Sequence, residues 1–222
     1  MKITILTLFP QIFEPVLSTS IIGRAAKNGL VEFEVVDLRP FGEGIHQVVD
    51  GRPYGGGVGM VLRVDILAKA LKKIKNNGHV ILTSASGKPL KQSRVRELSK
   101  KDHLVIVCGH YEGVDERFIE KYVNEEVSIG DFVLTGGEIP AMAIADAVTR
   151  LIPGVLKKEE AVLEESFSEN LLEYPQYTRP EDFEGLKVPE ILLSGNHEEV
   201  AKWRKEQSVK KTQNVRPDLL GS

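Results

Sequence analysis

Three glycine-bearing loops, each placed after an apolar run, are the residues whose types and spacing best suit a binding site. They lie at residues 84–87 after VILT, at 109–113 after HLVIVC, and at 128–138. In a parallel sheet, ligands bind beyond the carboxyl ends of the strands. Glycine lets backbone amides and carbonyls approach a planar ligand closely. Together the loops favour a nucleoside ligand, although each loop taken singly is equally consistent with a structural turn.

Neither common nucleotide fingerprint is present in the sequence. No Gly-x-Gly-x-x-Gly lies between a strand and a helix, and the glycine cluster at residues 55–59 lacks the Lys-Ser/Thr ending of a phosphate loop. A dinucleotide or triphosphate ligand is therefore disfavoured.

Residues 50–60, DGRPYGGGVGM, are a second candidate region. Their glycines and proline predict an exposed, mobile loop without regular structure, which carries Arg52 and Tyr54. Long loops in compact domains are often lids or binding loops. A disordered connector is the alternative interpretation.

The elements that must position these loops follow from the apolar pattern. Apolar runs at residues 2–8, 30–38, 79–83 and 103–108 alternate with helical patterns. This alternation predicts an α/β fold with a mainly parallel sheet flanked by helices. Residues 64–77 have apolar positions at helical spacing on one face. Residues 139–152 have almost no polar side, which is typical of a helix buried centrally or against another subunit.

The chain changes character after Gly154. Residues 157–184 carry a net charge of −6, whereas residues 196–216 carry +3. We therefore predict three parts, namely a catalytic and cofactor-binding domain at 1–156, an acidic linker at 157–173 and a small helical domain at 174–222. In the last part, Ser194 or Asn196 can cap a helix, and Trp203 is interpreted as a core anchor rather than a base-stacking platform.

The composition narrows the class of protein further. With 222 residues and 41% apolar content, the chain should bury a substantial core. No apolar run is long enough to cross a bilayer and the first residues do not fit a signal peptide, so we expect no membrane association and a cytoplasmic location. The single cysteine, Cys108, is expected to be a buried strand residue. Four of the histidines, at 46, 79, 103 and 197, are assigned no role.

Eight motifs carry a resemblance to a known family. They are SIGDFVLTGGEIPAM, GHYEGVDERF, DGRPYGGGVGM, LFPQIF, GRAAKNGL, RLIPGVL, YPQYTRP and VPEILLSGNHEEVAKWR. They closely resemble the bacterial tRNA (guanine-N1)-methyltransferases, from Phe9 nearly to Leu220. The resemblance implies a SPOUT methyltransferase fold with a deep trefoil knot, which local pattern alone cannot predict. It also implies a homodimer with the active site at the subunit interface.

The resemblance further implies that S-adenosyl-L-methionine binds in the knot against the three glycine-bearing loops. Mg²⁺ is implied as an assisting ion, with no residue assigned as a metal ligand. The residues expected to bind the cofactor are Leu82, Ser84, Gly109, Tyr111, Glu112, Gly113, Ser128, Ile129, Gly130, Asp131, Phe132, Val133, Leu134, Gly136, Gly137 and Pro140.

The expected chemistry asks for a carboxylate and an arginine. Guanine N1 carries a proton, so methyl transfer needs a base, and a cation must stabilise the charge that develops on O6. Where the family has an aspartate as base, this sequence has Glu165, and the adjacent Glu164 is an alternative. Arg150 occupies the place of the family's functional arginine. It also lies four residues after Asp146, so a purely structural ion pair is the competing interpretation.

The implied substrate is tRNA, with the guanine immediately 3′ of the anticodon withdrawn from its stack. The residues expected to contact the RNA are Asp50, Arg52, Tyr54, Lys202 and Arg204. Two other hypotheses remain: a SPOUT enzyme that methylates another RNA position such as a ribose 2′-hydroxyl, and a non-catalytic module that binds RNA or senses adenosine. The ribose-methylating enzyme would not need the carboxylate of Glu165. The non-catalytic module would need neither Glu165 nor Arg150.

Overall fold

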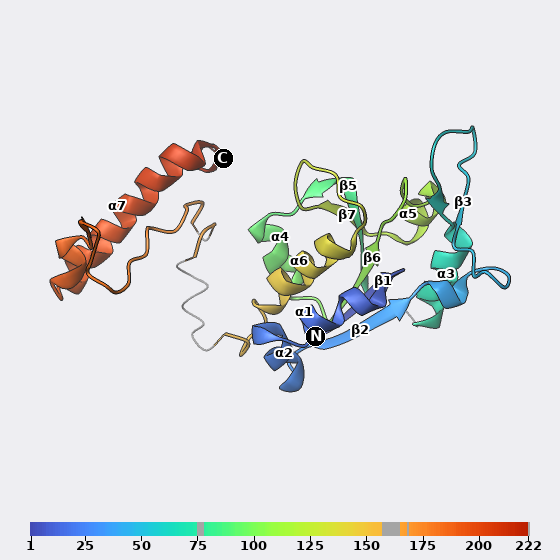
Figure 1. Ribbon diagram of the computed structural model, residues 1–222, viewed down its shortest axis with the longest axis horizontal. Helices are drawn as coiled ribbons and strands as arrows, with labels where there is room; N and C mark the ends of the chain where they lie inside the picture. The colour runs from blue at the N-terminus through green and yellow to red at the C-terminus, as the bar shows by residue number, and fades with distance from the viewer. Residues whose placement is uncertain (75–77, 157–164, 168, 222) are drawn as a thin grey trace. The chain divides into compact units, whose positions relative to one another are not determined.

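The computed structural model describes residues 1–74, 78–156, 165–167 and 169–221, and Figure 1 shows their course. The chain divides into two compact units, Met1–Lys157 and Lys158–Ser222. Each unit is described by itself below. Glu164, the alternative base, lies outside the described residues.

The first unit is built on a five-stranded sheet in which every pairing is parallel. The strand order is β2-β1-β6-β5-β7. Four strands correspond to the apolar runs, which confirms the predicted α/β class with a mainly parallel sheet. The fifth strand, β7, was not predicted because its sequence EEVS is short and begins with two glutamates. The strands are β1 (Lys2–Thr7), β2 (Glu32–Asp37), β5 (His79–Pro89), β6 (His103–Cys108) and β7 (Glu125–Ser128).

Helices cover both faces of this sheet, so the unit has three layers (Figure 1). Along β6, Leu104, Ile106 and Cys108 belong to one buried cluster, while Val105 and Val107 belong to the other. This alternation is the period-two pattern of a strand buried on both faces. One face packs against α1 (Glu14–Leu17), α2 (Ser20–Lys27), α4 (Gln92–Leu98) and α6 (Glu138–Thr149), the other against α3 (Val64–Lys73) and α5 (Glu116–Tyr122). Short 3₁₀ turns lie at η1 (Pro10–Ile12) and η2 (Arg39–Phe41).

The long apolar helix, predicted to be buried centrally or against another subunit, is only partly covered by the first unit. Within the first unit, α6 buries Ala141, Ile144, Ala145 and Val148 in the core, but Ile139 is 56% exposed. Ala143 and Asp146 are also exposed. Ile139 and Ala143 therefore form an uncovered apolar stripe in the single chain, with the charged Asp146 beside it.

The glycine-rich region at residues 50–60 is more regular at its start than predicted. Asp50–Gly51 forms β3, which pairs antiparallel with β4 (Val61–Leu62). The expectation of no regular structure is therefore wrong for the first two residues. The reason is that Val61 and Leu62 offer a partner strand just beyond the glycines.

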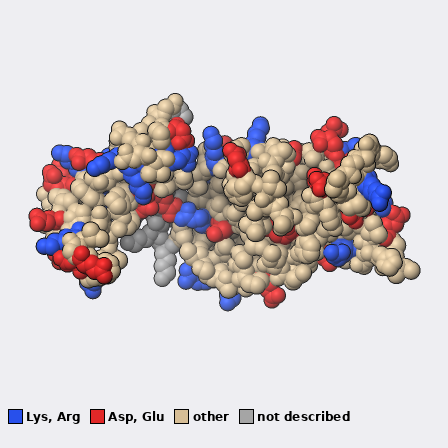
Figure 2. Space-filling model, turned by 45° about the horizontal axis from the view of Figure 1, so that its top comes forward, with Lys and Arg blue, Asp and Glu red and all other residues tan. Residues whose placement is uncertain are grey.

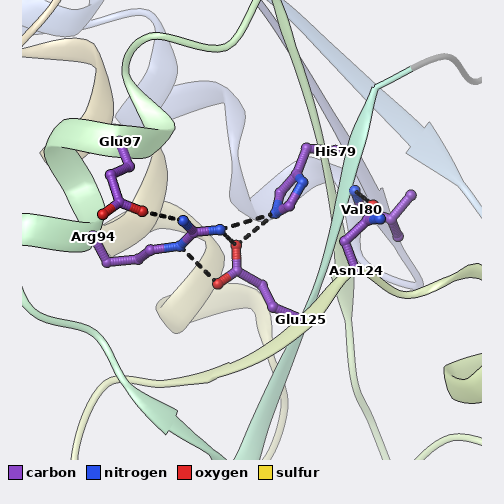
Figure 3. A network of polar contacts seen from close by, with 6 residues as sticks. All are labelled: His79, Val80, Arg94, Glu97, Asn124 and Glu125. Atoms are coloured by element: carbon purple, nitrogen blue, oxygen red, sulfur yellow. Dashed lines mark hydrogen bonds and ion pairs between the residues drawn. The ribbon is translucent and has the colours of Figure 1, made fainter.

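The amino ends of β5 and β7 are joined by a charged network, shown in Figure 3. His79 Nε2 lies 2.6 Å from Glu125 Oε1, and Arg94 donates from Nε and Nη2 to the two carboxylate oxygens at 2.9 and 2.7 Å. Arg94 also pairs with Glu97. Burial alone would raise the pKa of Glu125, but the hydrogen bonds from Arg94 and His79 more than offset it, and the pKa lies below its ordinary value. His79, assigned no role from sequence, is thus a structural residue.

The second unit is organised around a long helix, α7 (His197–Val215). Asn196 caps it, because its side-chain oxygen accepts from the backbone N–H of Glu199. Trp203 lies near Tyr177, with ring centroids 6.3 Å apart. The remaining elements are β8 (Asp182–Phe183), β9 (Leu186–Lys187), η4 (Glu190–Leu193) and η5 (Pro217–Leu220), of which β8 and β9 form an antiparallel hairpin.

Candidate functional site

A cavity with a volume of about 500 Å³ opens beside residues 82–86 of β5 and at the carboxyl ends of β6 and β7. Residues 109–113 and 128–137 form loop walls after β6 and β7, as predicted. The first predicted loop, residues 84–87, is instead part of β5, where the register with β7 shifts between Thr83 and Lys88, and Ser84 and Ser86 line the cavity from this irregular part of the strand. The loops touch one another through their backbones: the Gly137 N–H donates to the Gly109 carbonyl at 2.7 Å, and His110 forms a bridge with Gly136. The site is therefore assembled from backbone that three separate strands deliver to one place.

Two of the glycines are required by close packing. A Cβ added at Gly137 would lie 2.0 Å from Thr83 Oγ1 and 2.7 Å from the backbone nitrogen of Gly109. A Cβ at Gly109 would lie 2.8 Å from the carbonyl oxygen of Thr83. Real Cβ atoms do not come so close, so the loops reach their present separation only because these positions lack side chains.

Thr83, the last residue of the apolar run 79–83, links β5 to the carboxyl end of β6. It is 3% exposed, and its Oγ1 donates to the Val107 carbonyl at 3.2 Å and accepts from the Gly109 N–H at 3.3 Å. A second threonine, Thr7 at the end of β1, donates from its hydroxyl to the buried carboxylate of Glu138 at 2.9 Å. These two hydroxyls fix the loops that flank the cavity.

The region that follows β3 lies against the cavity wall. Backbone bonds run from Glu112 N to Met60 O at 3.0 Å and from Leu62 N to Gly113 O at 2.9 Å. Burial, and after it the negative charge of Asp50, raises the pKa of Tyr111. Asp50 is thus close to a residue of the cavity wall, whereas Tyr54 is 97% exposed.

The structure brings 15 of the 16 residues expected to bind the cofactor into the lining of this one cavity. The exception is Asp131, which is exposed and does not line it. Apolar surface accompanies the backbone walls, since Phe132 is 54% exposed and Leu134 37%. Four further lining residues lie in the predicted segments without having been named as cofactor contacts, namely Ala85, Ser86, His110 and Thr135. Lining residues outside those segments, which sequence reasoning did not single out, are Thr83, Val114, Glu116, Ile119, Glu126 and Val127.

Some of these residues left a signal in the sequence and others did not. Thr83 is a polar residue that ends an apolar run, and such a residue at a strand end is a candidate loop anchor. Glu126 gave no signal, because it lies in the strand β7 that was itself not predicted.

Arg150 does not line the cavity of its own chain. It follows the last residue of α6, whereas Gly137 and Pro140 at the other end of that helix form part of the cavity wall. Twelve helical residues at 1.5 Å each separate the two ends by about 18 Å. Within one chain the arginine and the cavity are therefore far apart.

Glu165, Lys202 and Arg204 belong to the second unit. Glu165 is half-buried and lines a smaller cavity of about 230 Å³ together with Arg204, Lys205 and Ser208. The guanidinium of Arg204 lies over the ring of Tyr174, 4.9 Å from its centroid. Lys202 is exposed.

Two searches of the described residues gave no further candidates. Among them, no helix has the length and apolar character needed to cross a membrane. No group of three or more His, Cys, Asp or Glu side chains within the described ranges is arranged to hold a metal ion.

A parallel sheet with helices on both faces, and a cavity of backbone walls beyond its strand ends, defines an α/β protein of the class that binds small ligands at the carboxyl edge. Within that class, the chain belongs to the tRNA (guanine-1)-methyltransferase TrmD family, whose match covers residues 1–222.

Individual relatives are similar over nearly the whole chain. The tRNA (guanine-N(1)-)-methyltransferase of Ruminiclostridium cellulolyticum is 52% identical, with 99% of this chain and 96% of that protein covered. The protein of the same name from Dictyoglomus turgidum is 53% identical, with 99% and 90% covered. That of Bacillus subtilis is 50% identical, with 99% and 92% covered.

Proposed function

We propose that this protein transfers a methyl group from S-adenosyl-L-methionine to N1 of the guanine immediately 3′ of the anticodon, position 37, in tRNA. The observation that carries the proposal is the glycine-walled cavity of about 500 Å³ in a chain of the TrmD family. The relatives' names support the base-methylating activity, and the cavity supports the kind of cofactor.

The residues of the cavity fit S-adenosyl-L-methionine. Backbone donors and acceptors of residues 109–113 and 128–137 suit an adenine edge, and Phe132 and Leu134 offer apolar surface to a flat ring. The close contact of Gly137 with Gly109 and Thr83 supports a knotted SPOUT arrangement, in which separate loops must pass near one another. When bound, the cofactor supplies an electrophilic methyl group whose bond to sulfur breaks, with the electron pair left on sulfur, as the bond to guanine N1 forms.

The chain's own residues handle the proton and the charge. The Glu165 carboxylate takes the N1 proton and is left as the neutral acid, while the electron pair of the N–H bond becomes available for attack. The Arg150 guanidinium stabilises the negative charge that develops on O6. The glycine-bearing walls of the cavity keep the methyl acceptor in line with the methyl group and exclude water from the reacting atoms.

The separation of Arg150 from its own cavity supports an active site shared between two subunits. The uncovered apolar stripe of α6, with Ile139 56% exposed, supports a homodimer in which this helix packs against the partner. In that arrangement Arg150 serves the cavity of the partner, and Glu165 reaches the cavity from the other subunit as well.

The proposed tRNA contacts come from both units. The region of Asp50, Arg52 and Tyr54, next to the cavity wall, would hold the extruded guanine and its neighbours. Lys202 and Arg204 on the basic α7 would contact phosphates, which give salt-dependent affinity without choice of sequence. Acidic and basic side chains are interspersed over the face drawn in Figure 2, so we expect local basic clusters rather than a uniformly basic surface. Assistance by Mg²⁺ and a cytoplasmic location belong to the same proposal.

Calorimetry with S-adenosyl-L-methionine, followed by single-turnover transfer of a labelled methyl group to tRNA transcripts, tests the proposal. The transcripts differ only at the guanine beside the anticodon, and methylation is expected only where that guanine is present. Failure to bind the cofactor contradicts the enzyme assignment and favours an RNA-binding module. A 2′-O-methyl product contradicts base methylation.

The role of Glu165 is tested by Glu165→Gln, which should abolish methyl transfer and leave cofactor affinity nearly unchanged, because the carboxylate acts on N1 and not on the cofactor. Glu165→Asp, which restores the family's residue, should keep measurable activity. The exposed Glu190→Gln is a matched control in the same unit and should behave as the wild type. Near-normal turnover of Glu165→Gln would mean that Glu164 or a water molecule takes the proton.

A further inference from the structure

The segment directly after Glu165 is folded into a closed turn. The Phe167 N–H donates to the Leu171 carbonyl at 2.8 Å, and the Glu173 N–H donates to Ser166 Oγ at 3.0 Å. Phe167 and Asn170 have φ of 72° and 57°, the left-handed values that a tight reversal requires. The described residues after Glu165, at 166–167 and 169–173, are therefore joined to one another by hydrogen bonds.

One face of α7 holds this turn. Residues 204, 208 and 212 recur every four residues, so they share one side of the helix, and Arg216 follows directly after its last residue. Arg204 lies over the Tyr174 ring, and Arg216 lies over the Phe167 ring with 6.0 Å to its centroid.

Two lysines on the same side of α7 add charged contacts to the turn. Lys205 pairs with Glu169, and Lys211 Nζ donates to the Glu173 carbonyl at 3.0 Å. Among the described residues of the turn, Phe167, Glu169, Glu173 and Tyr174 thus have contacts with this part of the chain. Exposed ion pairs and cation–π contacts of this kind are individually weak, so a buried contact must fix the position.

Thr212 provides that buried contact. It is fully buried, and its hydroxyl accepts from the Leu172 N–H at 2.8 Å while donating to the Ser208 carbonyl at 2.7 Å. Leu172 is itself 9% exposed, so water is a poor substitute for the hydroxyl. Removing the hydroxyl would leave a buried N–H without its acceptor, which is the costly case for a hydrogen bond.

We infer that Thr212 is a positioning residue for methyl transfer: through Leu172 it fixes the turn that carries Glu165 onto α7. The inference rests on the proposed role of Glu165 as the base. Its consequence is that the base is carried by α7 rather than by a free linker. Lys202 and Lys210 of the same helix are both exposed. Binding of RNA phosphates to α7 and delivery of the base to the guanine then become a single event.

The test uses the full-length protein with Thr212→Val, which keeps the side-chain shape and removes the hydroxyl. We expect the single-turnover rate constant at saturating cofactor and tRNA to fall by about 10- to 100-fold, since displacement of a catalytic group by about 1 Å has effects of that size. The dissociation constant for S-adenosyl-L-methionine should not change. Thr212→Ser restores the hydroxyl and should recover most of the rate, and Gln213→Ala, exposed on the same helix, is the control.

Hydrogen exchange gives a readout independent of activity. The Leu172 amide should lose protection in Thr212→Val and keep it in Thr212→Ser, with the melting of α7 followed by circular dichroism in parallel. Unchanged protection of residues 166–174 in Thr212→Val would overturn the inference, because the hydroxyl would then not hold the turn.

A double-mutant cycle separates positioning from general stabilisation. The cycle uses Glu165→Asp, which is expected to keep measurable activity: if Thr212 acts through Glu165, the effects of Thr212→Val and Glu165→Asp on the rate should not multiply. Independent, multiplicative effects would overturn the inference. A normal rate in Glu165→Gln would overturn the proposed base itself, whereas loss of rate in Glu165→Gln beside a normal rate in Thr212→Val would overturn only the positioning role.

Discussion

Strands β5 and β7 lie side by side, yet the contacts at one end of the pair are made by side chains and those at the other end by backbone. At the amino ends, the side chains of His79, Arg94 and Glu125 bind one another in a partly buried network (Figure 3). At the carboxyl ends, glycines bring backbone against backbone and leave a cavity of about 500 Å³. Side chains that fill space stabilise a fold, whereas a ligand needs the space left open. The comparison suggests that stability is concentrated at one edge of the sheet and binding at the other.

The largest effect is expected from filling the glycine contact at the carboxyl edge. Gly137 has φ −85° and ψ 0°, which alanine tolerates, so Gly137→Ala acts only through the contacts of its Cβ with Thr83 and Gly109. We expect cofactor affinity to fall by about 100-fold, or ~2.8 kcal/mol. The free energy of unfolding should fall by about 1–3 kcal/mol, as for other overpacked sites. Calorimetry and urea denaturation measure the two quantities.

Gly51→Ala is the matched control for this substitution. Its Cβ would meet only Arg63 Cγ at 3.9 Å, an ordinary contact. If both glycine variants bind the cofactor as the wild type does, the close approach at Gly137 has no part in binding.

A stability loss without a binding loss is expected at the amino edge. Glu125→Gln removes the charge that Arg94 and His79 share, and we expect the free energy of unfolding to fall by about 1–3 kcal/mol. Cofactor affinity should not change, because Glu125 does not line the cavity. A large fall in affinity would show that the two edges are not separate in function.

The same carboxylate gives the stability of the wild type a defined pH dependence. The pKa of Glu125 is lower in the folded than in the unfolded protein, so its contribution is present above the ordinary glutamate pKa of about 4.3. It is lost as the pH falls through the folded value. The stability difference between wild type and Glu125→Gln should therefore shrink below about pH 4, as measured by urea denaturation across pH.

The smallest effect is expected at the exposed end of the same network. Glu97 pairs with Arg94 three residues earlier on α4, and its side chain is 61% exposed. Glu97→Gln should change the free energy of unfolding by no more than about 0.5 kcal/mol, the range of exposed helical pairs. A change as large as that of Glu125→Gln would mean that Glu97, and not the buried carboxylate, organises Arg94.

The sequence predicted the strands that are marked by an apolar pattern. It did not predict the strands that depend on contacts with residues distant in the sequence. The runs that became β1, β6 and the first half of β5 were readable because both of their faces are buried, and the run of β2 was readable from its apolar residues although they are only partly buried. The strand β7 was not, since the charge of Glu125 is acceptable only beside Arg94 and His79, residues from other elements. The apolar pattern could not reveal the pairing of β3 with β4 either. Each of these strands has only two residues, and they lie on either side of a glycine-rich loop.

The candidate site shows the same division. The glycine-bearing segments pointed to the cavity, although residues 84–87 are part of β5 and not a loop after it. The family resemblance supplied the individual residues expected to bind the cofactor, of which 15 line the cavity. The part played by Thr83 depends on the positions of Val107 and Gly109 in space, which no local pattern contains. Thr212 was missed for the same reason, because a threonine within a helix acquires its role only from the distant Leu172.

Cys108, described above only as a core residue, has a practical consequence for labelling. It is the single cysteine of the chain, is 2% exposed, and its thiol has a pKa raised well above its usual range by burial and by the charge of Glu138. A thiol that is neither accessible nor ionised reacts slowly with alkylating reagents. A cysteine introduced at Val58, which is 91% exposed, would therefore accept a fluorophore selectively without prior removal of the native thiol.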